Sequence, residues 1–337
     1  MLQDCDLFTP VIDALKADPT IGFGAKVELL GRVDGQFSTV QRVRIQTPAR
    51  SVTVYAKILK PYNQTADEVA RACRMLRREY DATSALYQAL RQDAEIGAVR
   101  PVALLEAHRA LVTEEVPGRP LGDVLGEANQ ATEALLAVAR RIGAWTRIYQ
   151  SLANTQGAVV LSERRTYLED RLRQLEGRVI TAAEREAVLA KFDALAAQLR
   201  TSTLATVPIH ADLTPMNVIV DATGRIAVLD FTMAKVGTAL HDLSHIYFHF
   251  EMMGARQRKR EMMRDLQRAL LAGYSPALSD HDPLFRLMLM QHVVCHVAQL
   301  AGRRVPIVDV LYRWFLRRRW QACERMFLSE TSTLRAA

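Results

Sequence analysis

Residues 207–246 read VPIHADLTPMNVIVDATGRIAVLDFTMAKVGTALHDLSHI. Within 33 positions this stretch holds five polar side chains of the kinds that bind metals or take part in catalysis: His210, Asp212, Asn217, Asp230 and Asp242. The apolar runs at 218–220 and 226–229 flank a D-x-x-G turn signal, and this pattern predicts a short β-hairpin. Because a hairpin brings its two ends together, we expect the polar residues on either side of it to converge.

The converging set consists of Asp212 and Asn217 before the hairpin and Asp230 after it. A carboxylate and an amide oxygen are suitable ligands for a hard cation such as Mg²⁺. A second carboxylate, five residues before the amide, can orient a hydroxyl nucleophile. These are the parts that phosphoryl transfer needs, while the competing interpretation is a capped turn, in which Asp and Asn are also common.

The rest of the sequence has the composition of a soluble globular protein. Its 337 residues leave room for one large or two modest domains. Hydrophobic residues make up 49% and charged residues 24%, which excludes disordered, collagen-like and disulfide-scaffold proteins. The first ten residues contain no apolar signal core, and no stretch approaches the roughly 18–20 uninterrupted apolar residues of a membrane span. We therefore expect a cytoplasmic protein with four free cysteines.

Two kinds of pattern divide the chain. Residues 27–60 resemble strands, and in 52–58 apolar residues alternate with Thr53, Tyr55 and Lys57. Helical spacing follows over 66–91.

Two short strand-like runs come next and end at the break Pro117-Gly118. From 121 onward the pattern is mostly helical. The order predicts an α+β, bilobal chain. We expect an N-lobe over 1–116 with a small antiparallel β-sheet and a helix, a larger, mainly helical C-lobe over 117–337, and a cleft between them of the kind that binds ligands.

Three motifs in the C-terminal part resemble the aminoglycoside phosphotransferase family. HADLTPMN (210–217) matches the pattern H-x-D-x-x-x-x-N, LDFT (229–232) places an aspartate after an apolar strand, and GTALHDL (237–243) matches G-x-x-x-x-D-L. All three occur in the family's order. The resemblance covers about 25–330 and implies a protein-kinase-like fold and an ATP-dependent kinase of small molecules.

The resemblance also implies a role for each motif residue. Asp212 is the expected catalytic base or hydroxyl-orienting acceptor, and Asn217 and Asp230 are expected to hold Mg²⁺ on the ATP phosphates. His210 and Asp242 are expected to be structural supports of the catalytic loop, 210–217. Phe231-Thr232 stands where protein kinases have Phe-Gly, which argues against a metal loop that flips.

A kinase-like N-lobe needs a strand lysine for the phosphates and a helix glutamate to hold it. Lys57, in TVYAKIL, stands where that lysine is expected. Its alternative role is a solvated strand lysine. Glu79, in LRREYDA, is the preferred partner, and Glu68 is the alternative.

The phosphate-covering loop is expected near 31–39, with Gly31, Gly35 and Ser38 as its contacts. Backbone N–H groups between two glycines and a hydroxyl can bind a phosphate. The stretch is not G-x-G-x-x-G, and an ordinary hairpin loop fits it equally well.

The hinge between the lobes is expected at 114–116, where the backbone of Glu115 and Val116 would bind the purine. Tyr55 is expected to face the same cleft as Lys57 and to narrow the base pocket. The choice between ATP and GTP therefore stays open.

Histidines recur at four-residue spacing in the C-lobe, at His241, His245 and His249 and again at His292 and His296. Such pairs can bind zinc on one helix face. HExxH is absent from the sequence, and we favour a structural or surface role.

The net charge of +7 arises entirely in residues 243–337, which carry 15 Lys and Arg against 8 Asp and Glu. A solvated face is the plain interpretation, with Arg stems covering apolar surface. The functional alternative is an anionic partner, either an acidic or phosphorylated substrate or an anionic membrane surface met peripherally. Nucleic acid is disfavoured, because no recognised binding module accompanies the charge.

The family binds its acceptor against C-lobe helices, here 243–330, and their basic character disfavours a polycationic acceptor. We expect a sugar or glycoside hydroxyl as the acceptor. An aminoglycoside and a lipid-linked or membrane-associated acceptor are the alternatives. A pseudokinase scaffold is the alternative of another class, and the presence of Lys57, Asp212, Asn217 and Asp230 argues against it.

Overall fold

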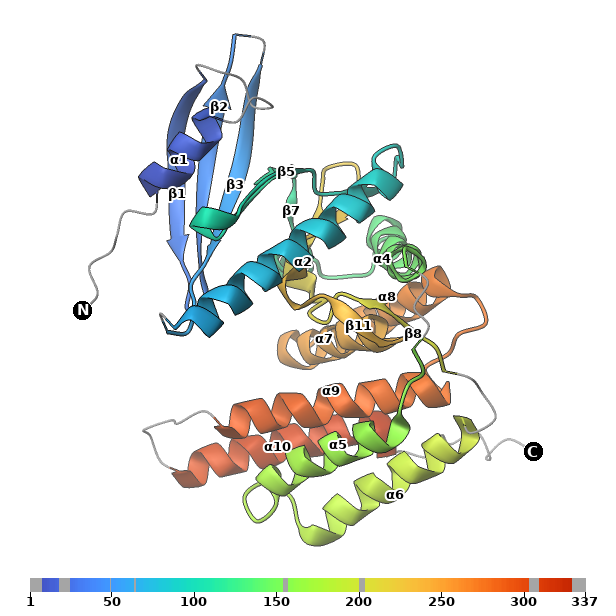
Figure 1. Cartoon of the computed structure of the whole chain (residues 1–337). Coiled ribbons are helices and arrows are strands. Elements are labelled where there is room, and N and C mark those ends of the chain that lie inside the picture. Colours follow the sequence, from blue (N-terminus) through green and yellow to red (C-terminus); the bar gives the residue numbers. More distant parts are fainter. Residues whose placement is uncertain are drawn as a thin grey trace. The chain divides into compact units, whose positions relative to one another are not determined.

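A computed structural model of the chain describes residues 8–17, 25–48, 50–63, 65–153, 157–199, 204–302 and 309–328. Packing divides the chain into two compact units (Figure 1): Met1–Ala128 with Pro215–Ala234, and Asn129–Thr214 with Lys235–Ala337. The first unit thus extends beyond the N-lobe expected over 1–116. It includes the chain up to Ala128 and the segment that carries the predicted hairpin.

A five-stranded antiparallel sheet is the framework of the first unit. Its strands are, in spatial order, β1 (Lys26–Asp34), β2 (Ser38–Gln46), β3 (Ser51–Leu59), β6 (Ala110–Glu114) and β5 (Pro101–Leu105). The alternation predicted for β3 is present, because Val54, Ala56 and Ile58 are buried in a core that also contains Leu15 of helix α1 (Phe8–Ala17). Lys57 consequently points to the opposite face of the sheet.

Helix α2 (Ala66–Leu90) confirms the helix predicted over 66–91. Thr65 caps it, since its side chain accepts a hydrogen bond from the backbone N–H of Glu68 at 3.4 Å. The buried residues follow the helical period: Ala72, Leu76, Glu79, Thr83, Leu86 and Leu90. Leu76 packs with Leu59 and Leu111 of the sheet. The same stripe therefore carries the Glu79 carboxylate toward the sheet.

The predicted hairpin is confirmed within a second sheet of the first unit. Its strands are, in spatial order, β4 (Ile96–Ala98), β10 (Ile226–Val228), β9 (Val218–Val220) and β7 (Arg119–Pro120). The Asp221 carboxylate closes the turn by accepting the backbone N–H groups of Thr223 and Arg225 at 2.8 and 3.0 Å. β10 pairs in parallel with β4 and β9 pairs with β7, which is why this segment packs with the first unit.

The predicted break at Pro117-Gly118 has a steric cause. Gly118 has a φ of +136°, and a Cβ there would lie 2.5 Å from the backbone oxygen of Val220. A larger residue would therefore displace β9. The short helices η1 (Glu106–His108), η2 (Pro215–Asn217), η3 (Phe231–Met233) and α3 (Leu121–Glu127) complete the first unit.

The second unit is mainly helical, which with the sheets of the first unit confirms the α+β class. Its helices are α4 (Glu133–Ser151), α5 (Leu161–Leu175), α6 (Ala182–Leu199), α7 (His241–Gln257), α8 (Arg260–Tyr274), α9 (Pro283–Gly302) and α10 (Asp309–Leu328). A two-stranded sheet joins β8 (Thr206–Ile209) to β11 (Lys235–Thr238). Figure 1 shows α9 next to α10 and α5.

Two glycines allow α4 and α8 to pack closely. A Cβ on Gly273 would lie 2.0 Å from the backbone oxygen of Arg140, and a Cβ on Gly143 would lie 2.2 Å from that of Leu270. Both contacts are to backbone, so an alanine at either position would force the helices apart.

Helix α9 is long and apolar enough to cross a membrane by length and composition, although polar residues interrupt its apolar run. Within the second unit, 72% of its most apolar window is buried. It packs against α5, α6, α7 and α10, as a core helix does.

Candidate active site

Lys57 and Glu79 form an ion pair inside the first unit. The Nζ of Lys57 lies 3.0 and 3.2 Å from the two carboxylate oxygens of Glu79, and the side chains are 17% and 5% exposed. Burial lowers the pKa of Lys57, but Glu79 and Asp230 outweigh it and raise that pKa overall. The alternative partner, Glu68, instead lies 3.3 Å from Arg71 in the first turns of α2.

Asp230 brings a second carboxylate to the same ammonium. Lys57 donates to its Oδ1 at 2.6 Å. Asp230 has a φ of +65° and accepts the backbone N–H of Thr232 at 3.3 Å, which starts η3. Burial alone would raise the pKa of Asp230. The charge of Lys57 and the hydrogen bonds from Lys57 and Thr232 outweigh burial, so the pKa is lowered overall and the carboxylate is ionised at neutral pH.

The Thr232 hydroxyl connects the members of this cluster. It lies 2.8 Å from Glu79 Oε2 and 2.7 Å from Asp230 Oδ1, and Lys57 Nζ donates to it. The sequence identified Thr232 only as a departure from Phe-Gly. A hydroxyl two positions after an expected metal ligand was the available signal for this contact.

Asn217 lies beside Asp230 because of the hairpin register. The backbone oxygen of Asn217 accepts the N–H of Leu229 at 2.8 Å, and Val218 pairs with Val228. The backbones that carry the two predicted Mg²⁺ ligands are therefore neighbours, as expected.

The donor set of this site fits Mg²⁺. The ionised Asp230 side chain is 44% exposed, and carboxylate and amide oxygens are hard ligands. Across the described ranges, no group of three or more His, Cys, Asp or Glu is suited to hold a metal.

The loop that carries Asp212 is held within the second unit by Asp242. The buried Asp242 carboxylate, in the first turn of α7, accepts the backbone N–H groups of His210 and Ala211 at 2.7 and 2.8 Å. The N–H of Asp212 donates to His210 Nδ1 at 3.3 Å. Burial raises the pKa of Asp242, but hydrogen bonds with His241 and the His210 backbone give a net downward shift.

This arrangement matches the supporting roles expected for His210 and Asp242, because both contact the loop backbone. Ala211 between them has a φ of +64°, an uncommon conformation for a residue with a Cβ. Asp212 belongs to the second unit and Asn217 to the first. The convergence of Asp212 with the Mg²⁺ ligands stays a prediction.

The expected phosphate loop is a hairpin turn between β1 and β2. The N–H of Gly35 donates to the backbone oxygen of Ser38 at 2.8 Å, and Gly31 lies within β1 beside an irregularity in the pairing. The Asp34 carboxylate accepts the Thr39 hydroxyl at 2.6 Å. Contacts from these residues to a phosphate stay a prediction, and the Gly35 N–H already has a partner.

At the expected hinge, the backbone contacts of Glu115 and Val116 to a purine stay a prediction. The N–H of Glu115 donates to the backbone oxygen of Thr53 at 2.9 Å, so that donor is engaged by the sheet and is not free for a purine. The N–H of Val116 has no partner among the residues that the structure describes, and it keeps the role predicted for it.

The Glu115 side chain fixes Tyr55 at this position. Its Oε1 accepts the Tyr55 hydroxyl at 3.1 Å, and its two oxygens pair with Arg42 at 2.9 and 3.1 Å. Burial and Glu115 both raise the pKa of Tyr55. Tyr55 and Lys57 share one face of β3, as the alternation predicted.

Four C-lobe histidines form a stack in the second unit, in which His241 and His292 are buried and His245 and His249 are half-buried. His292 lies between His241 and His245, with ring centroids 4.6 and 4.5 Å away, and His249 lies 4.8 Å from His245. Burial lowers the pKa of His245 and His292 strongly and that of His249 to about 4. The imidazoles of His245, His249 and His292 are therefore neutral at pH 7.

The sequence model of a known family matches most of this chain. The phosphotransferase enzyme family model covers residues 38–281, which include β2, β3, α2, the catalytic loop, α7 and α8. No curated protein matches the chain in sequence.

Solved structures share the fold at low sequence identity. A choline/ethanolamine kinase family protein from Mesorhizobium loti is 16% identical, with a TM-score of 0.57 over 97% of this chain and 96% of that one. An ADP-bound aminoglycoside phosphotransferase is 13% identical, with a TM-score of 0.55 over 96% and 99%. Streptococcus pneumoniae choline kinase is 14% identical, with a TM-score of 0.52 over 95% and 100%. The protein-kinase-like fold class is thus confirmed.

Proposed function

Because the chain belongs to the phosphotransferase enzyme family, and is therefore an ATP-dependent phosphotransferase acting on a hydroxyl group, we propose that it phosphorylates a sugar or glycoside-type acceptor. The observation that carries the nucleotide half of this proposal is the Lys57, Glu79 and Asp230 cluster. The basic character of residues 243–330 supports an acceptor that is not a polycation. We place the reaction in the cytoplasm.

Lys57 directs its ammonium to the phosphates of ATP, and Glu79 keeps that ammonium in position. Asn217 and Asp230 hold Mg²⁺, which neutralises negative charge on the phosphates when it is bound. The ammonium and two carboxylates of the cluster sum to one negative charge. A divalent cation is therefore electrostatically favoured there.

Asp212 orients the acceptor hydroxyl for attack on the γ-phosphorus. As the new O–P bond forms and the bond to the ADP oxygen breaks, the hydroxyl proton passes to the Asp212 carboxylate. Asp242 acts through the loop backbone and keeps Asp212 in place. Catalysis of this kind depends on positioning and charge stabilisation.

Ligand-induced thermal stabilisation separates this proposal from a pseudokinase scaffold. ATP with Mg²⁺ is expected to raise the unfolding temperature more than ATP alone, and Lys57→Ala is expected to remove the shift. Lys60→Ala is the matched control, because Lys60 is a neighbouring lysine that pairs with Asp34 outside the cluster. A shift that does not depend on the metal would favour the scaffold.

The acceptor is identified by ADP release with a panel of sugars, glycosides, aminoglycosides and lipid-linked sugars. The proposal predicts turnover with a neutral or acidic sugar hydroxyl. Turnover confined to aminoglycosides would favour an aminoglycoside as the acceptor. Turnover confined to lipid-linked compounds would favour a lipid-linked or membrane-associated acceptor.

A further inference from the structure

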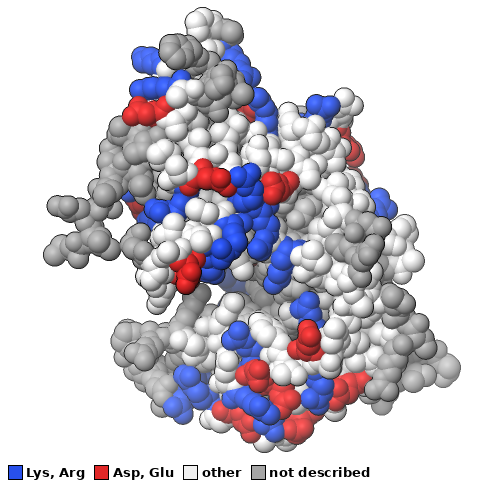
Figure 2. Space-filling view, viewed as in Figure 1, with Lys and Arg blue, Asp and Glu red and all other residues white. Residues whose placement is uncertain are grey.

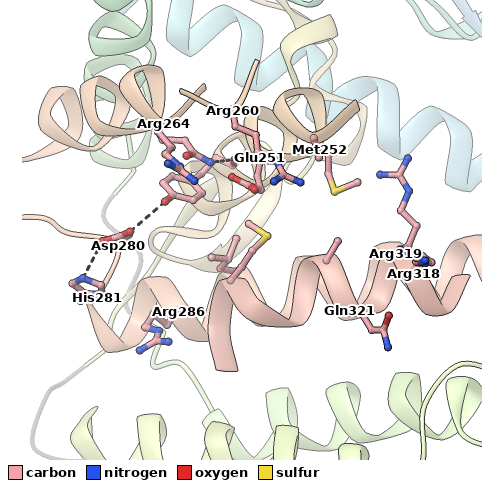
Figure 3. Close-up of a pocket in the computed structure, with 16 residues that line it drawn as sticks. Glu251, Met252, Arg260, Arg264, Asp280, His281, Arg286, Arg318, Arg319 and Gln321 are labelled. Atoms are coloured by element: carbon pink, nitrogen blue, oxygen red, sulfur yellow. Dashed lines mark hydrogen bonds and ion pairs between the residues drawn. The ribbon is translucent and has the colours of Figure 1, made fainter. Parts of the chain in front are cut away.

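The second unit contains a cavity of about 590 Å³ between α7, α8, α9 and α10. This volume lies in the range of small-molecule sites. Five arginines line it: Arg260, Arg264, Arg286, Arg318 and Arg319. Figure 3 shows Arg260 and Arg264 on one wall and Arg318 and Arg319 on the other, with Asp280 and His281 at the far end. Part of the positive charge of the basic C-terminal helices is therefore concentrated around this cavity.

Several arginines elsewhere in this unit pair with carboxylates. Over α5 and α6, where Figure 2 shows acidic and basic side chains intermixed, Arg165 pairs with Asp193 at 2.8 Å and Arg185 pairs with Glu176 at 2.7 Å. Arg317, beside the cavity arginines in sequence, pairs with Glu184 at 2.7 Å. Carboxylate pairing is thus one state that arginines of this unit adopt.

Four of the cavity arginines depart from this state. Arg260, Arg264, Arg318 and Arg319 have no carboxylate partner among the residues that the structure describes. The guanidinium of Arg318 lies 4.9 Å from the centre of the Trp314 ring, and that of Arg319 lies 5.4 Å from that of Phe315. Such cation–π contacts hold the charges in place without neutralising them. Unpaired and positioned guanidiniums are suited to bidentate binding of phosphate.

The acidic groups of the cavity are fewer and lie among hydrogen-bonding groups. Asp280 accepts the Tyr247 hydroxyl at 3.3 Å and lies 3.6 Å from His281 Nε2. Glu251 and Gln321 also line the cavity. Carboxylate and amide oxygens accept hydrogen bonds from ligand hydroxyls, so the cavity combines anion-binding and hydroxyl-binding groups.

We propose that this cavity binds a free, phosphorylated polyhydroxy small molecule, with the arginines on its phosphate oxygens and Glu251 and Asp280 on its hydroxyls. The cavity begins at Tyr247 on α7, five residues after Asp242, which holds the catalytic loop. Five residues of helix span about 7.5 Å. A ligand here is therefore bound by the same helix that supports the loop.

The test is calorimetric titration of the full chain with fructose 1,6-bisphosphate at saturating ADP, which occupies the nucleotide site. Saturable binding is expected in the wild type. Arg260→Gln with Arg264→Gln is expected to weaken binding at least about tenfold, as loss of charge-assisted contacts does. Arg318→Gln with Arg319→Gln should do the same from the opposite wall.

Arg268→Gln is the matched control. Arg268 lies one turn after Arg264 on α8, does not line this cavity, and pairs with Asp265. The affinity of the Arg268→Gln variant for fructose 1,6-bisphosphate should stay within about twofold of the wild type. Lys57→Ala should lose ATP binding but keep bisphosphate binding, which separates failure of this inference from failure of the proposed kinase function.

Three results would overturn the inference. These are absence of saturable bisphosphate binding, equal affinity in the wild type and both double arginine variants, and binding only to vesicles that contain phosphatidic acid. The last would assign the arginines to a lipid surface.

Discussion

The Nζ of Lys57 lies 2.6 Å from Oδ1 of Asp230, a residue 173 positions later in the chain. The same ammonium lies 3.0 Å from Glu79, so one cation serves two carboxylates. Asp230 is also the expected Mg²⁺ ligand. Under the proposed function, Asp230 would hold Mg²⁺ and Lys57 would bind the ATP phosphates, so these two residues would contact each other less in the ligand-bound protein.

Lys57→Met should destabilise the first unit as well as abolish nucleotide binding. Glu79 is only 5% exposed, and removing one partner of a buried ion pair leaves the other charge uncompensated. The expected loss is up to about 3 kcal/mol in the free energy of unfolding, measured in urea. Lys60→Met should change it by less than about 0.5 kcal/mol. Equal stability of the two variants would contradict the role assigned to the pair.

Thr232→Val should weaken the cluster because the Thr232 hydroxyl lies within hydrogen-bond distance of both carboxylates, has one proton to donate to them, and accepts from Lys57. Hydrogen bonds to charged groups contribute about 1.5–3 kcal/mol, and valine keeps the shape without the hydroxyl. We expect lower unfolding free energy and a higher KM for ATP, while Thr232→Ser retains both values. If serine lost as much as valine, the hydroxyl alone would not account for the effect.

Asp242→Asn should lower kcat with little change in the KM for ATP. The Asp242 carboxylate accepts two backbone N–H groups of the catalytic loop, whereas an amide offers only one oxygen. Weaker support should misplace Asp212, and loss of positioning can cost about 10²-fold in rate. Steady-state kinetics at varied ATP will separate the two parameters. A change in the KM for ATP alone would show that the loop does not position the base.

The histidine stack should make the protein acid-sensitive below pH 6.5. The folded-state pKa of His249 is about 4, and those of His245 and His292 lie well below 6.5. The unfolded chain therefore binds more protons, and stability falls as pH drops below the unfolded value. Each such histidine contributes a loss of about 1.4 kcal/mol per pH unit until its folded pKa is reached.

Unfolding free energies between pH 7 and 4.5 measure this loss. His249→Gln should reduce the slope, because one titrating group is removed. His281→Gln is the matched control, since His281 is exposed, and it should leave the slope unchanged. A wild-type slope in His249→Gln would show that the stack does not cause the acid sensitivity.

Local sequence patterns were sufficient to predict the hairpin at 218–228, the alternation in β3 and the helix that carries Glu79. Each element is encoded locally, because apolar residues recur every two positions along a strand or about every 3.6 positions along a helix. The Lys57–Glu79 pair followed from the family resemblance, which implied a strand lysine and a helix glutamate.

Contacts between distant segments could not be predicted in this way. The parallel pairing of β10 with β4 joins residues about 130 positions apart, and no local period encodes it. The engagement of the Glu115 N–H by Thr53 and the contacts of Thr232 likewise depend on the tertiary arrangement. The net charge of residues 243–337 was visible, but its concentration around one cavity required the packing of four helices.

The rate of γ-phosphate transfer in wild type and Asp212→Asn, with ATP and Mg²⁺ at saturation and the acceptor found in the panel, tests the central claim most directly. Asparagine keeps the size of the side chain but cannot take the hydroxyl proton. We predict that transfer falls at least about 10²-fold, while the Kd for ATP stays within about twofold of the wild type. Wild-type turnover in Asp212→Asn would contradict the assignment of Asp212 as the catalytic base.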